Sequence, residues 1–301
     1  MTGSSEAALR VGVIGLGQMG GGVARNLDAA GLLQAVWDTA PAAMAPFEQA
    51  GAALVAASPG AVAERCDVVI FVVPSSKEIA LCLDGPDGIL AQAATDQVLV
   101  DLTTSHPDDT KDLAARAKGA GRTYLDAGMS GGAQSADDGQ LALMFGGDAA
   151  AFDRIRPALE AIANMDKVFH VGPSGAGHTM KLVHNMICHT IFMATAEGCR
   201  VAEKAGIDLE TAVNVINNGN ARSFVSEFRF PRHILTGNWD ARSRVANLEK
   251  DLGMGVAMAQ ALGAPAAFSG ETLALLQRAM ASGMAETDFS RIYQEFDRLA
   301  E

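Results

Sequence analysis

The first half of the chain alternates short apolar runs with stretches of helical periodicity. Residues 67–73 are almost continuously apolar, which is typical of a strand that helices cover on both faces. Runs of similar character recur, and a helical stretch follows several of them. We predict strands at residues 9–14, 33–37, 67–73, 97–102, 123–126 and 141–145, and helices at 18–30, from 41 onward, and at 107–118. Such alternation indicates an α/β fold built on a doubly wound parallel sheet.

The pattern changes near Gly172, after which only helical periodicity is found. Apolar residues at 180, 183, 187, 191, 194 and 201 predict one helix of about seven turns. Further helices are expected at 209–217, 245–262, 266–282 and 289–299, with Asp208 and Asp288 as N-caps. The chain is therefore expected to contain an α/β domain at 1–172 and an all-helical domain at 173–301, joined by the long helix.

Composition limits the kinds of partner. The chain has 23 Lys and Arg against 35 Asp and Glu, a formal charge of −12 over 301 residues. This balance argues against nucleic-acid binding and against attachment to an anionic membrane, because both need a basic surface. A small anionic substrate remains compatible, since a pocket needs only a few local cations.

The sequence favours a cytoplasmic location. The four cysteines match no zinc or redox spacing, residues 1–8 lack the pattern of a secretory signal, and no apolar run reaches eighteen residues. We therefore predict a protein of a reducing compartment without a membrane span or a metal site.

A glycine-rich turn follows the first predicted strand. In Gly15-Leu16-Gly17-Gln18-Met19-Gly20 the first glycine permits a tight turn, the second lets the backbone approach a pyrophosphate, and the third lets helix and strand pack closely. The position of this turn between a strand and a helix predicts dinucleotide binding; the alternative is a purely structural turn.

Asp38 ends the second predicted strand, eighteen positions after Gly20. A carboxylate at this place accepts hydrogen bonds from ribose hydroxyls and repels a 2′-phosphate, and residues 39–43 contain no Arg or Lys. The sequence therefore predicts NAD rather than NADP. A role for Asp38 in capping the next helix is compatible with this one.

The segment Val13–Gly20 resembles the N-terminal motif of the β-hydroxyacid dehydrogenases, which include 3-hydroxyisobutyrate dehydrogenase, tartronate semialdehyde reductase and threonate dehydrogenase. The resemblance extends over nearly the whole chain through Val73-Pro74, Asp101–Thr104, Asp126–Gly132, Gly172–Gly177 with Lys181 and Asn185, and Lys250–Leu252. It implies a Rossmann-type domain like that of 6-phosphogluconate dehydrogenase, a long interdomain helix, and a helical domain for substrate binding and oligomerisation.

Lys181 and Asn185 lie four residues apart in the long predicted helix, so they share one face. A dehydrated lysine has a lowered pKa and can exchange a proton with a substrate hydroxyl. The resemblance implies that Lys181 is the general acid/base and that Asn185 holds the substrate. An ordinary solvated lysine is the alternative.

Ser130, Gly131 and Gly132 follow the strand predicted at 123–126, and their backbone N–H groups and hydroxyl suit a substrate carboxylate. The resemblance assigns this serine to that carboxylate; a plain loop is the alternative. Gly128 and Met129 stand where the family commonly has Pro and Val, and His184 stands where it often has Asn. His184 is either a structural residue or a substrate contact.

The resemblance places Val73, Pro74 and Thr104 along the nicotinamide half of the cofactor, and Lys250 on the cofactor side of the helical domain. The alternative for Lys250 is a surface pair with Glu249 or Asp251. Three arginines of the helical half are left outside the predicted site: Arg222, Arg229 and Arg232.

Together these features predict an oxidoreductase that transfers a hydride between NAD and a small 3-hydroxy acid resembling 3-hydroxyisobutyrate, or its semialdehyde. The partner would be a small carboxylate-bearing substrate, and the apolar long helix suggests a homodimer or homotetramer. Two alternatives remain: an imine reductase of the same architecture, whose members generally lack the lysine, and a non-catalytic cofactor-binding module.

Overall fold

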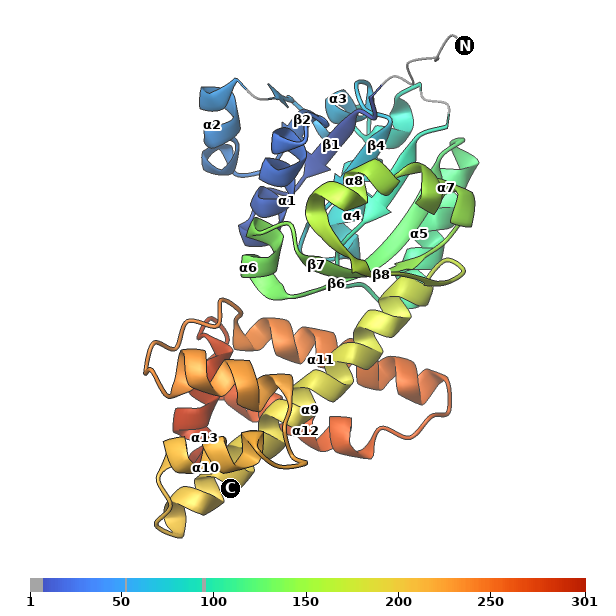
Figure 1. The fold of residues 1–301 in the computed structure, drawn as a ribbon. Helices are drawn as coiled ribbons and strands as arrows, with labels where there is room; N and C mark the ends of the chain where they lie inside the picture. Colours follow the sequence, from blue (N-terminus) through green and yellow to red (C-terminus); the bar gives the residue numbers. More distant parts are fainter. Residues whose placement is uncertain (1–7, 52, 94–95) are drawn as a thin grey trace. The chain divides into compact units, whose positions relative to one another are not determined.

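The computed structural model describes residues 8–51, 53–93 and 96–301 (Figure 1). The chain divides into two compact units, Met1–Lys181 and Leu182–Glu301, which we call the N-terminal and C-terminal units. The division falls inside the long helix α9 (Ala176–Lys204). It lies nine residues after the predicted position at 172, because the first turn of α9 packs against the sheet.

An eight-stranded sheet forms the centre of the N-terminal unit, in the order β3-β2-β1-β4-β5-β6-β7-β8. Neighbouring strands are parallel except β6 and β7, which are antiparallel. The order of the first six strands is that of a doubly wound dinucleotide-binding sheet. The predicted fold class is therefore confirmed, with one antiparallel pair that the sequence did not indicate. The strands are β1 (Val11–Ile14), β2 (Leu33–Trp37), β3 (Leu54–Val55), β4 (Val68–Phe71), β5 (Val98–Asp101), β6 (Thr123–Ser130), β7 (Leu141–Gly146) and β8 (Ala163–Gly172).

Helices cover both faces of this sheet, and the strand side chains alternate between two apolar cores. In β4, Val68 and Ile70 pack in the core beneath α1 and α8, whereas Val69 and Phe71 pack in the core beneath α3, α4 and α5. A strand buried on both faces needs apolar residues at every position, which explains the continuous run at 67–73. The helices of this unit are α1 (Gln18–Ala29), α2 (Pro41–Ala50), α3 (Pro59–Ala63), α4 (Ser76–Leu83), η1 (Ile89–Ala91), α5 (Pro107–Gly119), α6 (Gly132–Asp137), α7 (Ala149–Arg154) and α8 (Arg156–Ile162).

The C-terminal unit is built from the remaining length of α9 and the helices that follow it (Figure 1). Its core includes Phe192 and Cys199 of α9, which pack among apolar residues of the later helices. Asp208 caps α10 by accepting a hydrogen bond from the Thr211 amide at 2.9 Å, and Asp288 caps η3, as the sequence predicts. The helices are α10 (Leu209–Asn217), the π-helix η2 (Val225–Ile234), α11 (Val245–Ala261), α12 (Ala267–Ala281), η3 (Phe289–Arg291) and α13 (Ile292–Ala300).

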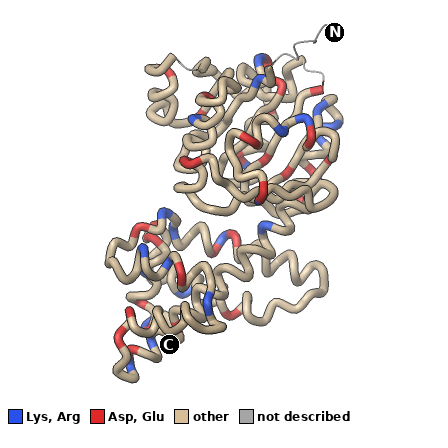
Figure 2. The backbone as a smooth tube through the Cα atoms, in the orientation of Figure 1, with Lys and Arg blue, Asp and Glu red and all other residues tan. Residues whose placement is uncertain are grey.

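Positions of Lys and Arg and of Asp and Glu are interspersed along the backbone of each unit (Figure 2). Among the described residues, no helix is long and apolar enough to cross a membrane.

Candidate active site

The glycine-rich turn joins β1 to α1, and its three glycines have different surroundings. Gly15 has a φ of +91°, and a Cβ at Gly15 or at Gly20 would overlap backbone atoms of the turn and of the segment after β4. A Cβ at Gly17 would meet no heavy atom within 4 Å. These are the tight turn, the close packing and the open approach that a pyrophosphate needs, so the turn fits a dinucleotide.

The other residues of this turn contribute mainly through the backbone. Leu16 is buried in the core, Met19 packs against that core, and Gln18 is exposed. Helix α1 begins after Gly17, and no side chain caps it. Its first N–H groups therefore point to where phosphate oxygens would lie.

Asp38 follows β2 and joins this turn. Its carboxylate accepts hydrogen bonds from the amide of Leu16 at 2.6 Å and from the amide of Ala40 at 2.8 Å. The structure thus brings Asp38 to the glycine-rich turn, and its bond to Ala40 closes a local turn before α2. The N-cap of α2 is Ala40 and no side chain caps this helix, so the capping role suggested as an alternative is wrong.

Val73, Pro74 and Thr104 lie in the segments that follow β4 and β5. A Cβ at Gly15 would be 3.0 Å from a methyl carbon of Val73, so the segment after β4 adjoins the glycine-rich turn. Pro74 is exposed, and Thr104 is partly buried between the buried residues Thr103 and Ser105. These residues are at the carboxyl ends of neighbouring parallel strands, which is where ligands of doubly wound sheets bind.

The predicted substrate loop is more regular than its sequence suggests. Ser130 is the last residue of β6, rather than part of a loop after a strand that ends at residue 126. Gly131 and Gly132 begin α6, with φ values of +119° and +72°, which only glycine adopts readily. The serine therefore projects from a strand held by β7, while the two glycines form the turn after it.

Lys181 lies against the same strand. A Cβ at Gly128 would be 3.1 Å from Cγ and 3.3 Å from Cα of Lys181, and closer still to its Cβ. Gly128 and Ser130 are two residues apart in β6, so their side-chain directions share one face. The Lys181 stem thus packs on the face of β6 toward which Ser130 projects.

Asn185 belongs to a polar group of the C-terminal unit that includes Asp251, which the sequence suggested only as a partner of Lys250. The Asn185 side chain is 4% exposed and donates a hydrogen bond to Asp251 at 2.8 Å, and its oxygen is 3.1 Å from Nδ1 of His184. Lys250 Nζ is 3.3 Å from the Asp251 carboxylate. Lys250 forms the pair that its sequence alternative proposes, and His184 contacts Asn185.

Two buried carboxylates were also not assigned a role from the sequence. Asp101 and Asp126 are paired in register on β5 and β6, and both are fully buried. Tyr124 donates to Asp101 at 2.8 Å, and burial beside this carboxylate raises the pKa of Tyr124 well above its usual value. The sequence alone does not show that Tyr124 meets Asp101, because the contact depends on the pairing of β5 and β6.

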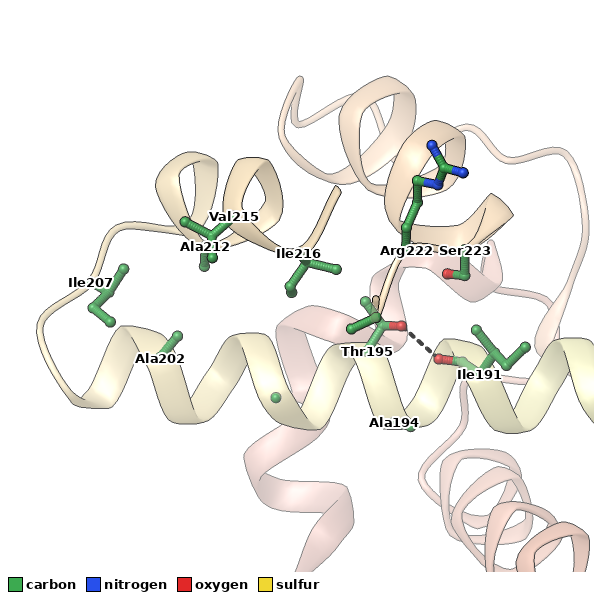
Figure 3. A pocket seen from close by; sticks show the side chains of 12 residues that line it. Ile191, Ala194, Thr195, Ala202, Ile207, Ala212, Val215, Ile216, Arg222 and Ser223 are labelled. Carbon is green, nitrogen blue, oxygen red and sulfur yellow. Dashed lines mark hydrogen bonds between the residues drawn. The ribbon is translucent and has the colours of Figure 1, made fainter. Parts of the chain in front are cut away.

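A separate apolar pocket of about 630 Å³ lies in the C-terminal unit, between α9, α10 and residues 221–223 (Figure 3). Its lining includes Ile191, Thr195, Val215 and Ile216, and Arg222 lies at its edge with the guanidinium directed away from these residues (Figure 3). It contains none of the predicted site residues. We therefore do not assign it to catalysis.

A glycine-rich turn fitted to a pyrophosphate, at the carboxyl edge of a doubly wound sheet, defines a dinucleotide-dependent protein. Residues 10–172 match the family of the NAD binding domain of 6-phosphogluconate dehydrogenase. Residues 175–296 match the family described as NAD-binding of NADP-dependent 3-hydroxyisobutyrate dehydrogenase. The chain belongs to the β-hydroxyacid dehydrogenases, a family of oxidoreductases that act on CH–OH groups, and its cofactor is NAD.

Relatives match over nearly the full length. L-threonate dehydrogenase of Escherichia coli is 31% identical, with 95% of this chain and 94% of that protein covered. NAD-dependent L-serine dehydrogenase of Pseudomonas aeruginosa is 31% identical over 96% of this chain and 98% of its own. The structure of Mycobacterium tuberculosis 3-hydroxyisobutyrate dehydrogenase with L-serine superposes with a TM-score of 0.85, at 30% identity, and covers 96% of this chain and 99% of its own. The resemblance and the dinucleotide cofactor predicted from the sequence are confirmed.

Proposed function

We propose that this chain oxidises a small 3-hydroxy acid resembling 3-hydroxyisobutyrate, or reduces the corresponding semialdehyde, with Lys181 as the general acid/base. The observation that carries the proposal is the packing of the Lys181 stem on the face of β6 toward which Ser130 projects. A proton-transferring amine and a carboxylate-binding hydroxyl that meet on one face of β6 suit a small hydroxy acid.

In the oxidation, the Lys181 amine accepts the proton of the substrate hydroxyl as the carbon–oxygen double bond forms. In the reduction, the ammonium returns that proton to the carbonyl oxygen. The cofactor, when bound, supplies the hydride acceptor or donor. Ser130 and the amides of Gly131 and Gly132 hold the carboxylate, and Asn185, fixed by Asp251, binds the substrate through its remaining amide hydrogen.

On the cofactor side, we propose that the amides of the turn from Gly15 to Gly20 hold the pyrophosphate and that Asp38 holds the ribose. Val73, Pro74, Thr104 and Lys250 complete the cofactor site as predicted from the sequence. The relatives' names cover threonate, serine and hydroxyisobutyrate, so the family leaves a choice among small hydroxy acids.

The test is an NADH-absorbance screen of 3-hydroxyisobutyrate, glycerate, threonate, 3-hydroxypropionate, serine and phenylserine. With the best substrate, Lys181→Ala should lower kcat by about 10²- to 10⁴-fold, the usual contribution of a general acid/base, and leave NADH binding unchanged. Lys118→Ala is the matched control, because Lys118 is an exposed helical lysine of the same unit. Full activity in Lys181→Ala would refute the mechanism.

We also propose that the protein resides in a reducing compartment, the cytoplasm, and forms a homodimer or homotetramer. Cys66, Cys82 and Cys199 are buried free thiols, which supports the first proposal. The apolar pocket of the C-terminal unit and the exposed side chains on its rim support the second.

A further inference from the structure

The first turn of α9 is held by a buried carboxylate. Asp126 of β6 is fully buried and accepts hydrogen bonds from the amides of Gly175 at 2.7 Å and His178 at 2.9 Å. Amides at the start of a helix have no partner within it, so a carboxylate there satisfies two of them and interacts favourably with the helix dipole. Because Asp126 lies in the sheet, this cap also fixes α9 to β6.

Small residues bring the two backbones into direct contact at this point. A Cβ at Gly177 would lie 2.6 Å from the carbonyl oxygen of Asp126 and 2.9 Å from the amide nitrogen of Gly146. No side chain therefore separates the helix from β6 and β7 here. The helix has little freedom to shift while the cap is in place.

His178 attaches the same turn to α5. Its side chain is fully buried, and Nδ1 is 2.7 Å from the hydroxyl of Thr110. The same hydroxyl is 3.2 Å from the carbonyl oxygen of His106, and the tautomer of His178 decides whether Nδ1 donates to the hydroxyl or accepts from it. Nε2 faces the Asp101 carboxylate at 3.8 Å. One residue thus joins α9 to β6 through its amide and to α5 through its ring.

Lys181 comes three residues after His178, less than one turn along the same helix. Its Cα is fixed by the helix and its stem packs on Gly128, so any tilt of the first turn moves the amine. We infer that Asp126 and His178 are positioning residues for Lys181, which hold its amine at one place over β6 through the cap on α9 and the bond to Thr110. This inference rests on the proposed function, because the placement of the Lys181 amine matters for turnover only if Lys181 is the general acid/base.

The experiment compares two substitutions of the histidine. His178→Asn keeps an amide that can donate to or accept from the Thr110 hydroxyl, whereas His178→Leu fills similar space without a polar atom. We expect His178→Leu to lower kcat by about 10- to 100-fold, as misplacement of a catalytic group by up to 1 Å does, with the KM for NADH unchanged. His178→Asn should stay within about threefold of the wild type.

Thr110, whose hydroxyl contacts His178, allows a second measurement. Thr110→Val should lower kcat as His178→Leu does, and the double variant should be no slower than either single one, because both remove the same bond. Equal loss of kcat in His178→Asn and His178→Leu would overturn the inference, as would additive losses in the double variant.

Asp126→Asn replaces one acceptor with a donor and should lower kcat without changing the KM for NADH. The matched control is Asp148→Asn, because Asp148 caps α7 of the same unit through the amide of Ala151 at 2.8 Å. Both variants should lower Tm, but only Asp126→Asn should lower kcat. Equal loss of kcat in the two would mean that Asp126 is merely structural.

A readout independent of turnover separates this inference from the proposed function. The rate at which an amine-selective acylating reagent labels Lys181, followed by peptide mass spectrometry, should change severalfold in His178→Leu and stay unchanged in Asp148→Asn. If the wild type turned over no substrate, the proposed function would fail while the labelling still tested the positioning. Identical labelling of Lys181 in the wild type and His178→Leu would overturn it.

Discussion

Gly128→Ala adds a single methyl group to β6 at the point where the strand meets α9. Its Cβ would lie 3.1 Å from Cγ and 3.3 Å from Cα of Lys181, and closer still to Cβ. Unstrained carbon atoms approach to about 3.5–4.0 Å. The Cα distance involves the backbone of a helix that Asp126 fixes, so rotation of the lysine stem alone cannot relieve the overlap.

The size of the effect follows from the displacement that the methyl group requires. Restoring ordinary contact distances moves the Lys181 stem by about 1 Å, and a misplacement of this size costs about 100-fold in rate, or about 2.7 kcal/mol in the barrier. Overpacking also costs about 1–3 kcal/mol of stability. We therefore expect kcat to fall about 100-fold and Tm to fall by several degrees.

The assay is steady-state turnover with NADH titration and thermal unfolding on the same samples. Gly119→Ala is the matched control, because a Cβ at the last residue of α5 meets nothing within 4 Å. It should leave kcat and Tm near wild-type values. A kcat for Gly128→Ala within twofold of the wild type would refute the packing of Lys181 on β6. An equal loss of NADH affinity would show that the change acts on the whole unit instead.

Three further predictions concern the cofactor, stability and assembly. Asp38→Ala should raise the Kd for NADH by about tenfold or more, because it removes an acceptor for the ribose hydroxyls. The Kd for NADPH should then come closer to the Kd for NADH, because the carboxylate that would repel a 2′-phosphate is gone. Tighter binding of NADPH than of NADH by the wild type would contradict the role of Asp38. Asp297 accepts two hydrogen bonds from Arg200, which lower the pKa of its carboxyl to about 2, so the pair stabilises the fold above pH 3.8 and loses this effect as the pH falls toward 2. Between pH 4 and pH 2 the Tm of Asp297→Asn should therefore fall less than that of the wild type. An equal fall would exclude the Asp297–Arg200 pair as a source of acid-sensitive stability. In light scattering, the wild type should be a dimer or tetramer, and Val215→Glu, which places a charge in the apolar pocket, should favour the monomer; a monomeric wild type would end the assembly proposal.

The sequence predicted those elements whose burial leaves a regular pattern. Strands such as β4 and β5, buried on both faces, produce apolar runs, and α9 to α12 produce helical periodicity. By contrast, β8 was missed because it mixes Asp166 and Lys167 with apolar residues that are themselves exposed, such as Phe169 at 54%. Only Ala163 is buried in this edge strand, and Met165 and Val168 are partly buried, so no clear apolar pattern marks it in the sequence.

The candidate site divides in the same way. Chemistry-bearing residues at recognisable spacings, such as Lys181 and Asn185, can be nominated from residue type and helical period. Contacts that depend on distant parts of the chain cannot: nothing in the sequence shows that Asp251 meets Asn185, or that Gly128 lies beneath Lys181. Glycine is the extreme case, because its contribution here is the space that it leaves for another residue.

The N-termini of α1 and α9, both in the N-terminal unit, differ in whether their amides are available to a ligand. Helix α1 begins after Gly17 with no side-chain cap, so its first N–H groups remain available to phosphate oxygens. At the start of α9, by contrast, the amides of Gly175 and His178 are already bonded to the buried carboxylate of Asp126. Because these two amides are already bonded, the proposed function places the substrate carboxylate at Ser130 and the turn that follows it. Asp126 thus occupies amides at the start of α9 that an anionic ligand would otherwise bind, and by our inference this cap holds Lys181 in place.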